Sequence, residues 1–169
     1  RGLSLRFQLA GRAARDPADA RNDRGARRIA AVHTVGGELR QLEERRAGVE
    51  QQIEPLARRF AESGYRIALL ARDADKLATL AADVPGARGF ACDATDPVAL
   101  KAALAQAAAE MGPVDVLVYN AGKGVWGDAL SIDEAAFEDA WRLNAFGLFA
   151  AAREVLPAML AKGQGAIVV

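Results

Sequence analysis

The sequence contains few of the residues that build disulfides or zinc sites. Cys92 is the only cysteine and His33 the only histidine among 169 residues. No internal disulfide can form, which suits a reducing, cytoplasmic compartment. His33 has no cysteine or second histidine near it in the sequence, so we expect a packed or edge residue rather than a metal ligand. We predict no metal site.

The sequence also lacks an excess of either charge and a long apolar run. Acidic and basic residues number 22 each, and the zero net charge argues against a bulk attraction to nucleic acid or to a membrane. No apolar run approaches the roughly 20 residues of a membrane span. With 51% hydrophobic and 26% charged residues, the composition is typical of one globular domain. Because the chain starts at Arg1 and stops at Val169 inside an apolar run, we expect a fragment of a longer protein.

One stretch, Val114–Gly122 (V-D-V-L-V-Y-N-A-G), organises the chain. Its β-branched apolar residues form a run too short for a helix, and such a run is typical of a strand buried in a parallel sheet. Ligands of open α/β sheets bind outside the carboxyl ends of the strands. Asn120, Ala121 and Gly122 therefore stand where a ligand is expected.

From residue 53 onward, strands and helices alternate, which predicts a doubly wound parallel sheet of the Rossmann type. The predicted strands are Tyr65–Ala71, Gly89–Cys92, the Val114–Gly122 stretch and Ala166–Val169, and the predicted helices are Asp75–Ala82, Val98–Met111 and Phe137–Leu160.

Polar residues mark where several of these helices start. Asp73 is expected to help start the first helix, and Asp96 with Pro97 forms an N-cap signal before the second. Ser131 and Glu134 match a capping box, so Ser131 is interpreted as a helix cap rather than a nucleophile.

A strand that ends in Asn-Ala-Gly, set among these elements, resembles the fourth strand of the short-chain dehydrogenase/reductase family. The resemblance runs from about Leu56 to Val169, roughly two-thirds of the chain. It implies an oxidoreductase that transfers hydride between a nicotinamide cofactor and a small carbonyl or alcohol substrate. The alternative is another doubly wound domain whose strand happens to end in these residues.

The resemblance implies NADP or NADPH as cofactor because of the residues after the second strand. Arg72 follows that strand, where an acidic residue would bind the ribose 2′-hydroxyl of NAD and an arginine accommodates a 2′-phosphate. Ala71 stands where NAD-preferring relatives would carry aspartate. A guanidinium suits phosphate because its planar fork offers paired donors and a permanent charge. A solvated surface arginine is the alternative.

The other site residues are also assigned by resemblance. Asp93 and Ala94, after the third strand, correspond to the family's adenine contacts, although Asp93 could simply form a local turn. Asn120, Ala121 and Gly122 correspond to the segment that lines the cofactor ribose and braces the sheet.

Asn144 is the one catalytic residue that the resemblance assigns, as the asparagine that holds a water in the proton relay. Its partners in the family, a serine and a Tyr-x-x-x-Lys pair on a helix, would lie beyond Val169, so we expect the chain by itself to be inactive. Tyr119 and Lys123 have the right spacing, but they fall on a strand end and a loop, where helical i,i+4 geometry is missing.

The N-terminal 52 residues depart from the family pattern. The glycine places of the expected G-x-x-x-G-x-G turn fall on Ala47, Gln51 and Ile53. Either Ile29–Val35, followed by Gly36 and Gly37, substitutes for the first strand, or residues 1–52 are foreign sequence from a reading-frame error, which the abrupt boundary favours.

Within that segment the sequence predicts little regular structure. An edge strand over Leu3–Leu9, a disordered linker over Ala10–Arg28 and a helix over Glu38–Ala61, broken near Gly48 and Pro55, are expected. We therefore divide the chain into an atypical segment, 1–52, and a partial dinucleotide-binding domain, 53–169.

Two other functions remain open from the sequence. One is a non-catalytic member of the same fold that binds a nucleotide or a protein partner. The other is nucleic-acid binding through the arginine-rich N-terminus, although interleaved aspartates and missing aromatics disfavour it. The resemblance also implies a homo-oligomer of the full-length parent, through the helix over Phe137–Leu160.

Overall fold

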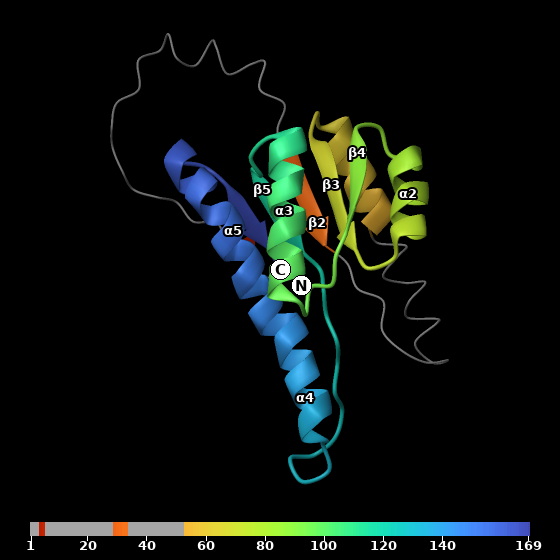
Figure 1. Ribbon diagram of the computed structural model, residues 1–169, viewed down its shortest axis with the longest axis vertical. Helices are drawn as coiled ribbons and strands as arrows, with labels where there is room; N and C mark the ends of the chain where they lie inside the picture. The colour runs from red at the N-terminus through yellow and green to blue at the C-terminus, as the bar shows by residue number, and fades with distance from the viewer. Residues whose placement is uncertain (1–3, 6–28, 34–52) are drawn as a thin grey trace.

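The computed structural model of the chain describes residues 4–5, 29–33 and 53–169. These residues form a sheet with the strand order β1-β6-β5-β2-β3-β4 (Figure 1). All neighbouring strands are parallel except β1, which runs antiparallel to β6. The strands are β1 (Ser4–Leu5), β2 (Ile29–His33), β3 (Arg66–Ala71), β4 (Ala87–Ala91), β5 (Val116–Tyr119) and β6 (Ala166–Val168). The predicted doubly wound parallel sheet is confirmed.

Strand β2 fills the centre of this sheet. Ala31 is paired with Ala68 of β3 on one side and with Leu117 of β5 on the other. All five residues of β2 are buried, as expected for a short apolar strand covered on both faces. This pairing matches the alternative in which Ile29–Val35 substitutes for the first strand. The Gly36-Gly37 turn lies outside the described residues, and a foreign origin for residues 1–52 stays a prediction.

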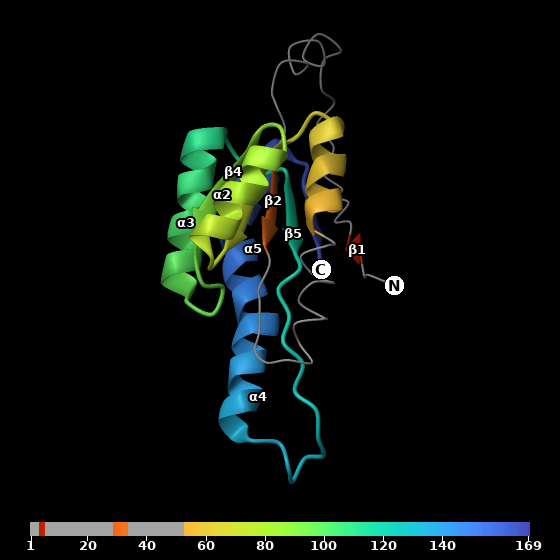
Figure 2. The same ribbon diagram turned by 90° about the vertical axis from the view of Figure 1, so that its right-hand side faces the viewer.

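Helices cover both faces of the sheet. A helix over residues 53–62 and α2 (Ala74–Asp83) cover one face, and α3 (Pro97–Met111) and α5 (Gly147–Lys162) cover the other. Figure 2 shows the helix over residues 53–62 and α3 on opposite sides of the sheet. Gly64, with a φ of +83°, stands after the first of these helices as a left-handed stop, as the sequence predicts. Pro55 lies within the described part of that helix, so the predicted break at Pro55 is wrong.

The predicted N-caps are confirmed for α2 and α3, and the predicted cap before the helix that starts near residue 134 is wrong. The side chain of Asp73 accepts a hydrogen bond from the Lys76 N–H at the start of α2, and Asp96 caps α3 ahead of Pro97. The capping box at Ser131 is wrong: Asp133 caps α4 (Glu134–Trp141) by accepting from the Ala136 N–H. Asp128 competes for Ser131, since the two residues bond each other in a turn before the helix.

The predicted helix over Phe137–Leu160 is longer and less regular than the sequence indicates. It runs through α4, the π-helical segment η3 (Arg142–Phe146) and α5, and Figure 1 shows α4 extending away from the sheet. The whole stretch Glu134–Lys162 is long and apolar enough to cross a membrane by length and composition alone, contrary to the sequence expectation. Core helices of globular domains meet the same criterion, and α5 buries Ala150, Ala151 and Val155 within the domain core.

The remaining boundaries differ from the predictions by a few residues. Strand β4 begins two residues before the predicted Gly89–Cys92, and β5 covers only the middle of the Val114–Gly122 stretch. Of the predicted strand over Leu3–Leu9, only Ser4–Leu5 lies among the described residues. The predicted linker over Ala10–Arg28 and most of the helix over Glu38–Ala61 lie outside them.

Candidate cofactor site

The candidate site lies at the edge of the sheet where parallel strands end. His33 is the last residue of β2, Arg72 and Asp93 follow β3 and β4, and Asn120 follows β5. The carboxyl ends of parallel strands meet at one edge, which is where open α/β sheets bind ligands. The structure therefore brings most of the predicted site residues to one side of the domain.

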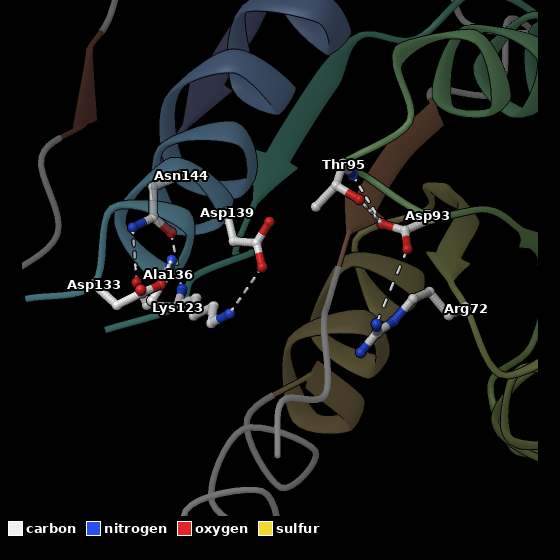
Figure 3. Close-up of polar contacts among 8 residues, drawn as sticks. All are labelled: Arg72, Asp93, Thr95, Lys123, Asp133, Ala136, Asp139 and Asn144. Atoms are coloured by element: carbon white, nitrogen blue, oxygen red, sulfur yellow. Dashed lines mark hydrogen bonds and ion pairs between the residues drawn. The ribbon is translucent and has the colours of Figure 1, made fainter. Parts of the chain in front are cut away.

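Arg72 and Asp93 form a charged pair at this edge. Nη1 of Arg72 lies 4.0 Å from Oδ2 of Asp93, and each side chain is close to half exposed (Figure 3). The other oxygen of Asp93, Oδ1, accepts two hydrogen bonds from Thr95, one from its N–H and one from its hydroxyl, both at 2.8 Å. A cation and a fixed carboxylate thus stand side by side, within reach of solvent.

Hydrogen bonds stabilise the ionised form of the Asp93 carboxyl. Partial burial raises the pKa of the Asp93 carboxyl, but the two Thr95 bonds, together with Arg72 and His33, outweigh burial and hold the pKa below its ordinary value. Thr95 was not singled out from the sequence. The only available signal was its position two residues after a strand-ending aspartate, which favours local side-chain bonding to the turn.

Ala94 is buried, and its backbone carbonyl packs against the start of α5. A Cβ added to Gly147 would lie 2.7 Å from this carbonyl oxygen. The predicted cofactor loop after β4 therefore rests on a helix position that has room only for glycine.

The Asn120–Gly122 segment leads from β5 to Asn144. The N–H of Asn120 continues the sheet by donating to the His33 carbonyl at 3.2 Å. Ala121 is buried, and Gly122 lies beside Asn144, since a Cβ at Gly122 would stand 3.8 Å from its Oδ1. The predicted cofactor segment and the predicted catalytic residue are thus neighbours in space.

The amide of Asn144 holds the backbone of Lys123 with two hydrogen bonds. Oδ1 accepts from the Lys123 N–H at 2.8 Å, and Nδ2 donates to the Lys123 carbonyl at 2.9 Å (Figure 3). Asn144 itself lies in η3, and π-helical turns inside α-helices occur frequently at functional sites. This clamp, and the contact of Lys123 Nζ with Asp139 at 3.5 Å, were not foreseen from the sequence.

Tyr119 and Lys123 do not form a catalytic pair, in agreement with the sequence analysis. The Tyr119 hydroxyl donates to the backbone carbonyl of Leu143, and burial raises the pKa of Tyr119 to about 12. The Lys123 ammonium faces Asp139 instead. Nothing in this geometry lowers the pKa of the tyrosine toward neutrality.

His33 is packed, as predicted, and it stacks on Tyr119 with ring centroids 5.6 Å apart. Neither ring nitrogen has a hydrogen-bond partner among the residues that the structure describes. Burial lowers the pKa of His33 to about 4, so the imidazole is neutral at physiological pH. Within residues 4–5, 29–33 and 53–169, no cluster of three or more His, Cys, Asp or Glu residues could hold a metal ion.

Comparison with known proteins places this geometry in a family. A short chain dehydrogenase family model matches residues 54–169. Galactitol 2-dehydrogenase (L-tagatose-forming) of Cereibacter sphaeroides is 39% identical over 115 residues, which are 67% of this chain and 45% of that protein. The NAD(+)-named 2-dehydro-3-deoxy-L-rhamnonate dehydrogenase of Sphingomonas sp. (strain SKA58) is 35% identical over 125 residues, 72% of this chain and 48% of that one.

A solved structure agrees with these relatives. L-sorbose reductase from Gluconobacter frateurii, complexed with NADPH and L-sorbose, superimposes with a TM-score of 0.65 at 26% identity, over 86% of this chain and 52% of that one. The chain spans about half the length of the curated relatives that it matches. The matched residues include all of the predicted site residues, from Arg72 to Asn144, and the chain belongs to the short-chain dehydrogenase/reductase family.

Proposed function

We propose that the complete protein is an NADP(H)-dependent oxidoreductase that transfers hydride between nicotinamide and a carbonyl or alcohol group of a small molecule. One observation carries the cofactor preference: Arg72 stands at the carboxyl edge of the sheet directly after β3, with 48% of its side chain exposed. A guanidinium there can donate hydrogen bonds to a 2′-phosphate, whereas the preceding Ala71 offers no carboxylate to a 2′-hydroxyl.

The residues around Arg72 fit the adenosine half of such a cofactor. Asp93 is ionised and 40% exposed, so its carboxylate can accept from an amino group such as that of adenine. Ala94 and the Asn120–Gly122 segment offer small side chains and backbone against which a ring or a ribose can lie. The bound cofactor would supply the hydride, and the protein would hold and orient it.

The names of the relatives include both cofactors. The proposal of NADP therefore rests on Arg72 and not on membership of the family. One is named for NAD(+) and another was solved with NADPH. Their names also concern galactitol, a deoxy sugar acid and L-sorbose. We therefore propose a small polar carbonyl or alcohol compound as substrate.

We further propose that these 169 residues alone do not catalyse the reaction. The serine and the helical Tyr-x-x-x-Lys pair implied by the resemblance have no counterpart in the sequence, and Tyr119 is committed to the Leu143 carbonyl. Turnover of NADPH by this chain would contradict the proposal. A longer gene product whose next helix lacks Tyr-x-x-x-Lys would instead favour the non-catalytic alternative, a nucleotide- or partner-binding member of the same fold.

A cytoplasmic location and a homo-oligomeric parent complete the proposal. Burial of the single thiol, which raises the pKa of Cys92 to about 11, fits a protein that does not use disulfides. The exposed aromatic residues Phe137, Trp141 and Phe149 on α4 and α5 are suited to an interface between subunits. The arginine-rich segment of the nucleic-acid alternative lies outside the described residues, and a strongly salt-dependent retention on DNA would favour that alternative.

The test is calorimetric titration of the chain with NADP⁺ and with NAD⁺, repeated with Arg72→Ala. We expect NADP⁺ to bind more tightly, and we expect the substitution to weaken NADP⁺ roughly tenfold while it changes NAD⁺ little. Arg88→Ala is the matched control, because the Arg88 side chain is also exposed, 59% against 48% for Arg72, but it pairs with Glu110 away from the carboxyl edge. Equal loss of both cofactors in Arg72→Ala, or a preference for NAD⁺, would contradict NADP specificity.

A further inference from the structure

The two oxygens of the Asp93 carboxylate face different residues. Oδ1 takes both hydrogen bonds from Thr95, and Oδ2 faces Nη1 of Arg72 at 4.0 Å (Figure 3). A direct bond between a guanidinium and a carboxylate is about 2.8 Å long. Asp93 therefore stands close enough to orient Arg72 but is held short of a direct bond with it.

Thr95 supplies both of the hydrogen bonds that Asp93 Oδ1 accepts. Its N–H and its hydroxyl grip the same oxygen, and two donors on one atom fix the carboxylate on the side of the turn. A side-chain substitution can remove the hydrogen bond from the Thr95 hydroxyl but not the one from the Thr95 N–H. Without the hydroxyl, Asp93 keeps only the backbone bond and can rotate toward the guanidinium.

We infer that Thr95 is a positioning residue for cofactor selectivity, which holds the Asp93 carboxylate away from Arg72 so that the guanidinium can receive a 2′-phosphate. The inference rests on the proposed function. A carboxylate that closes on Arg72 would compete with the phosphate for the same donors, because both ligands match the planar fork of the guanidinium. NAD⁺, which carries no 2′-phosphate, would not meet that competition.

The experiment measures, by calorimetry, the ratio of the NAD⁺ dissociation constant to the NADP⁺ dissociation constant for the full chain and for Thr95 variants, so a preference for NADP⁺ gives a ratio above one. Thr95→Val keeps the branched shape and loses the hydroxyl, and we expect it to reduce the preference for NADP⁺ roughly threefold to tenfold. Thr95→Ser keeps the hydroxyl and should retain the preference. Any loss of adenine contacts at Asp93 affects both cofactors alike and cancels in the ratio.

Two further variants separate positioning from folding. Thr95→Ala, which removes the hydroxyl without a branched replacement, should lower the ratio as Thr95→Val does. In an Asp93→Asn background the competing charge is gone, so Thr95→Val should no longer change the ratio, and this double-mutant cycle isolates the coupling. Thr79→Val on the exposed face of α2 controls for the loss of a hydroxyl elsewhere.

The outcomes distinguish this inference from the proposed function. If the unaltered chain prefers NADP⁺ and Thr95→Val leaves the ratio unchanged, or lowers it equally in the Asp93→Asn background, the inference is overturned and the proposed function stands. If the unaltered chain binds neither cofactor, or prefers NAD⁺, the proposed cofactor preference fails and the inference fails with it.

Discussion

The hydroxyl of Tyr119, at the end of β5, donates a hydrogen bond to the backbone carbonyl of Leu143, in the π-helical segment η3. This bond ties the central part of the sheet to the helix that carries Asn144. Both groups are buried, so the bond holds the Asn120–Gly122 segment and η3 in one arrangement. Gly147, which follows η3, lies against both the Tyr119 hydroxyl and the Ala94 carbonyl.

Gly147→Ala should destabilise the fold. In an exposed helix an alanine would be more stable than glycine by about 1 kcal/mol. At Gly147 the added Cβ would lie 2.7 Å from the Ala94 carbonyl and would also collide with the Tyr119 hydroxyl. We expect the free energy of unfolding to fall by about 1–3 kcal/mol, measured by urea denaturation.

Gly122→Ala is the matched control for this change. Its new Cβ would meet only Asn144 Oδ1, at the ordinary contact distance of 3.8 Å. Its free energy of unfolding should stay within about 0.5 kcal/mol of the unaltered chain. A Gly147→Ala chain as stable as this control would show that the helix start can move away from the β4 loop.

Much of the fold follows from local sequence signals, and the misses have physical causes. Short apolar runs predicted β3 and β5, and aspartates predicted the starts of α2 and α3, because these signals act within a few residues. Whether Ile29–His33 is the central strand depends on pairing with residues far along the chain, which no local pattern reports. The capping box at Ser131 is wrong because the motif does not report that Asp128 binds Ser131 in a turn while Asp133 caps α4.

The site was predictable as a set of residues but not as a set of contacts. The order of strands indicates that Arg72 and Asp93 meet at one edge, and they do. The grip of Thr95 on Asp93 and the clamp of Asn144 on Lys123 depend on side-chain geometry across separate elements. The role of Asn144 in a proton relay stays a prediction, because the described contacts of its amide are to backbone.

Stability should depend on pH through His33, the only histidine. Its pKa is lowered from 6.5 to about 4 by burial, so between these values the unfolded chain binds more protons than the folded one. The contribution of neutral His33 is therefore complete above pH 6.5 and is lost as the pH falls toward 4. We expect the free energy of unfolding to fall by about 3 kcal/mol across this window. Urea denaturation at a series of pH values measures this change.

His33→Phe separates this effect from carboxylates that titrate at the acid end of the window. Phenylalanine keeps a ring against Tyr119 and cannot be protonated, so the slope of stability between pH 6.5 and 5 should flatten. The absolute stability of the variant is not the readout. An unchanged slope would assign the pH dependence to other groups.

Asn144→Ala should loosen the loop that follows Gly122. Removing the amide leaves the Lys123 N–H without its bond of 2.8 Å, so its hydrogen exchange should accelerate by at least roughly tenfold. The comparison is Asp139→Asn, which removes only the exposed ion pair with Lys123 Nζ and should change that exchange little. Equal acceleration in both variants would assign the order of the loop to the ion pair.

The position of β2 has a consequence for how the chain assembles. Its neighbours are residues 66–71 and 116–119, and the bond from the Ile29 N–H to the Asp115 carboxylate spans 86 residues. The sheet therefore closes only after distant parts of the chain meet, which predicts slow folding. Until β2 inserts, the inner sides of β3 and β5 present unpaired N–H and C=O groups, and such open edges invite another chain to pair with them.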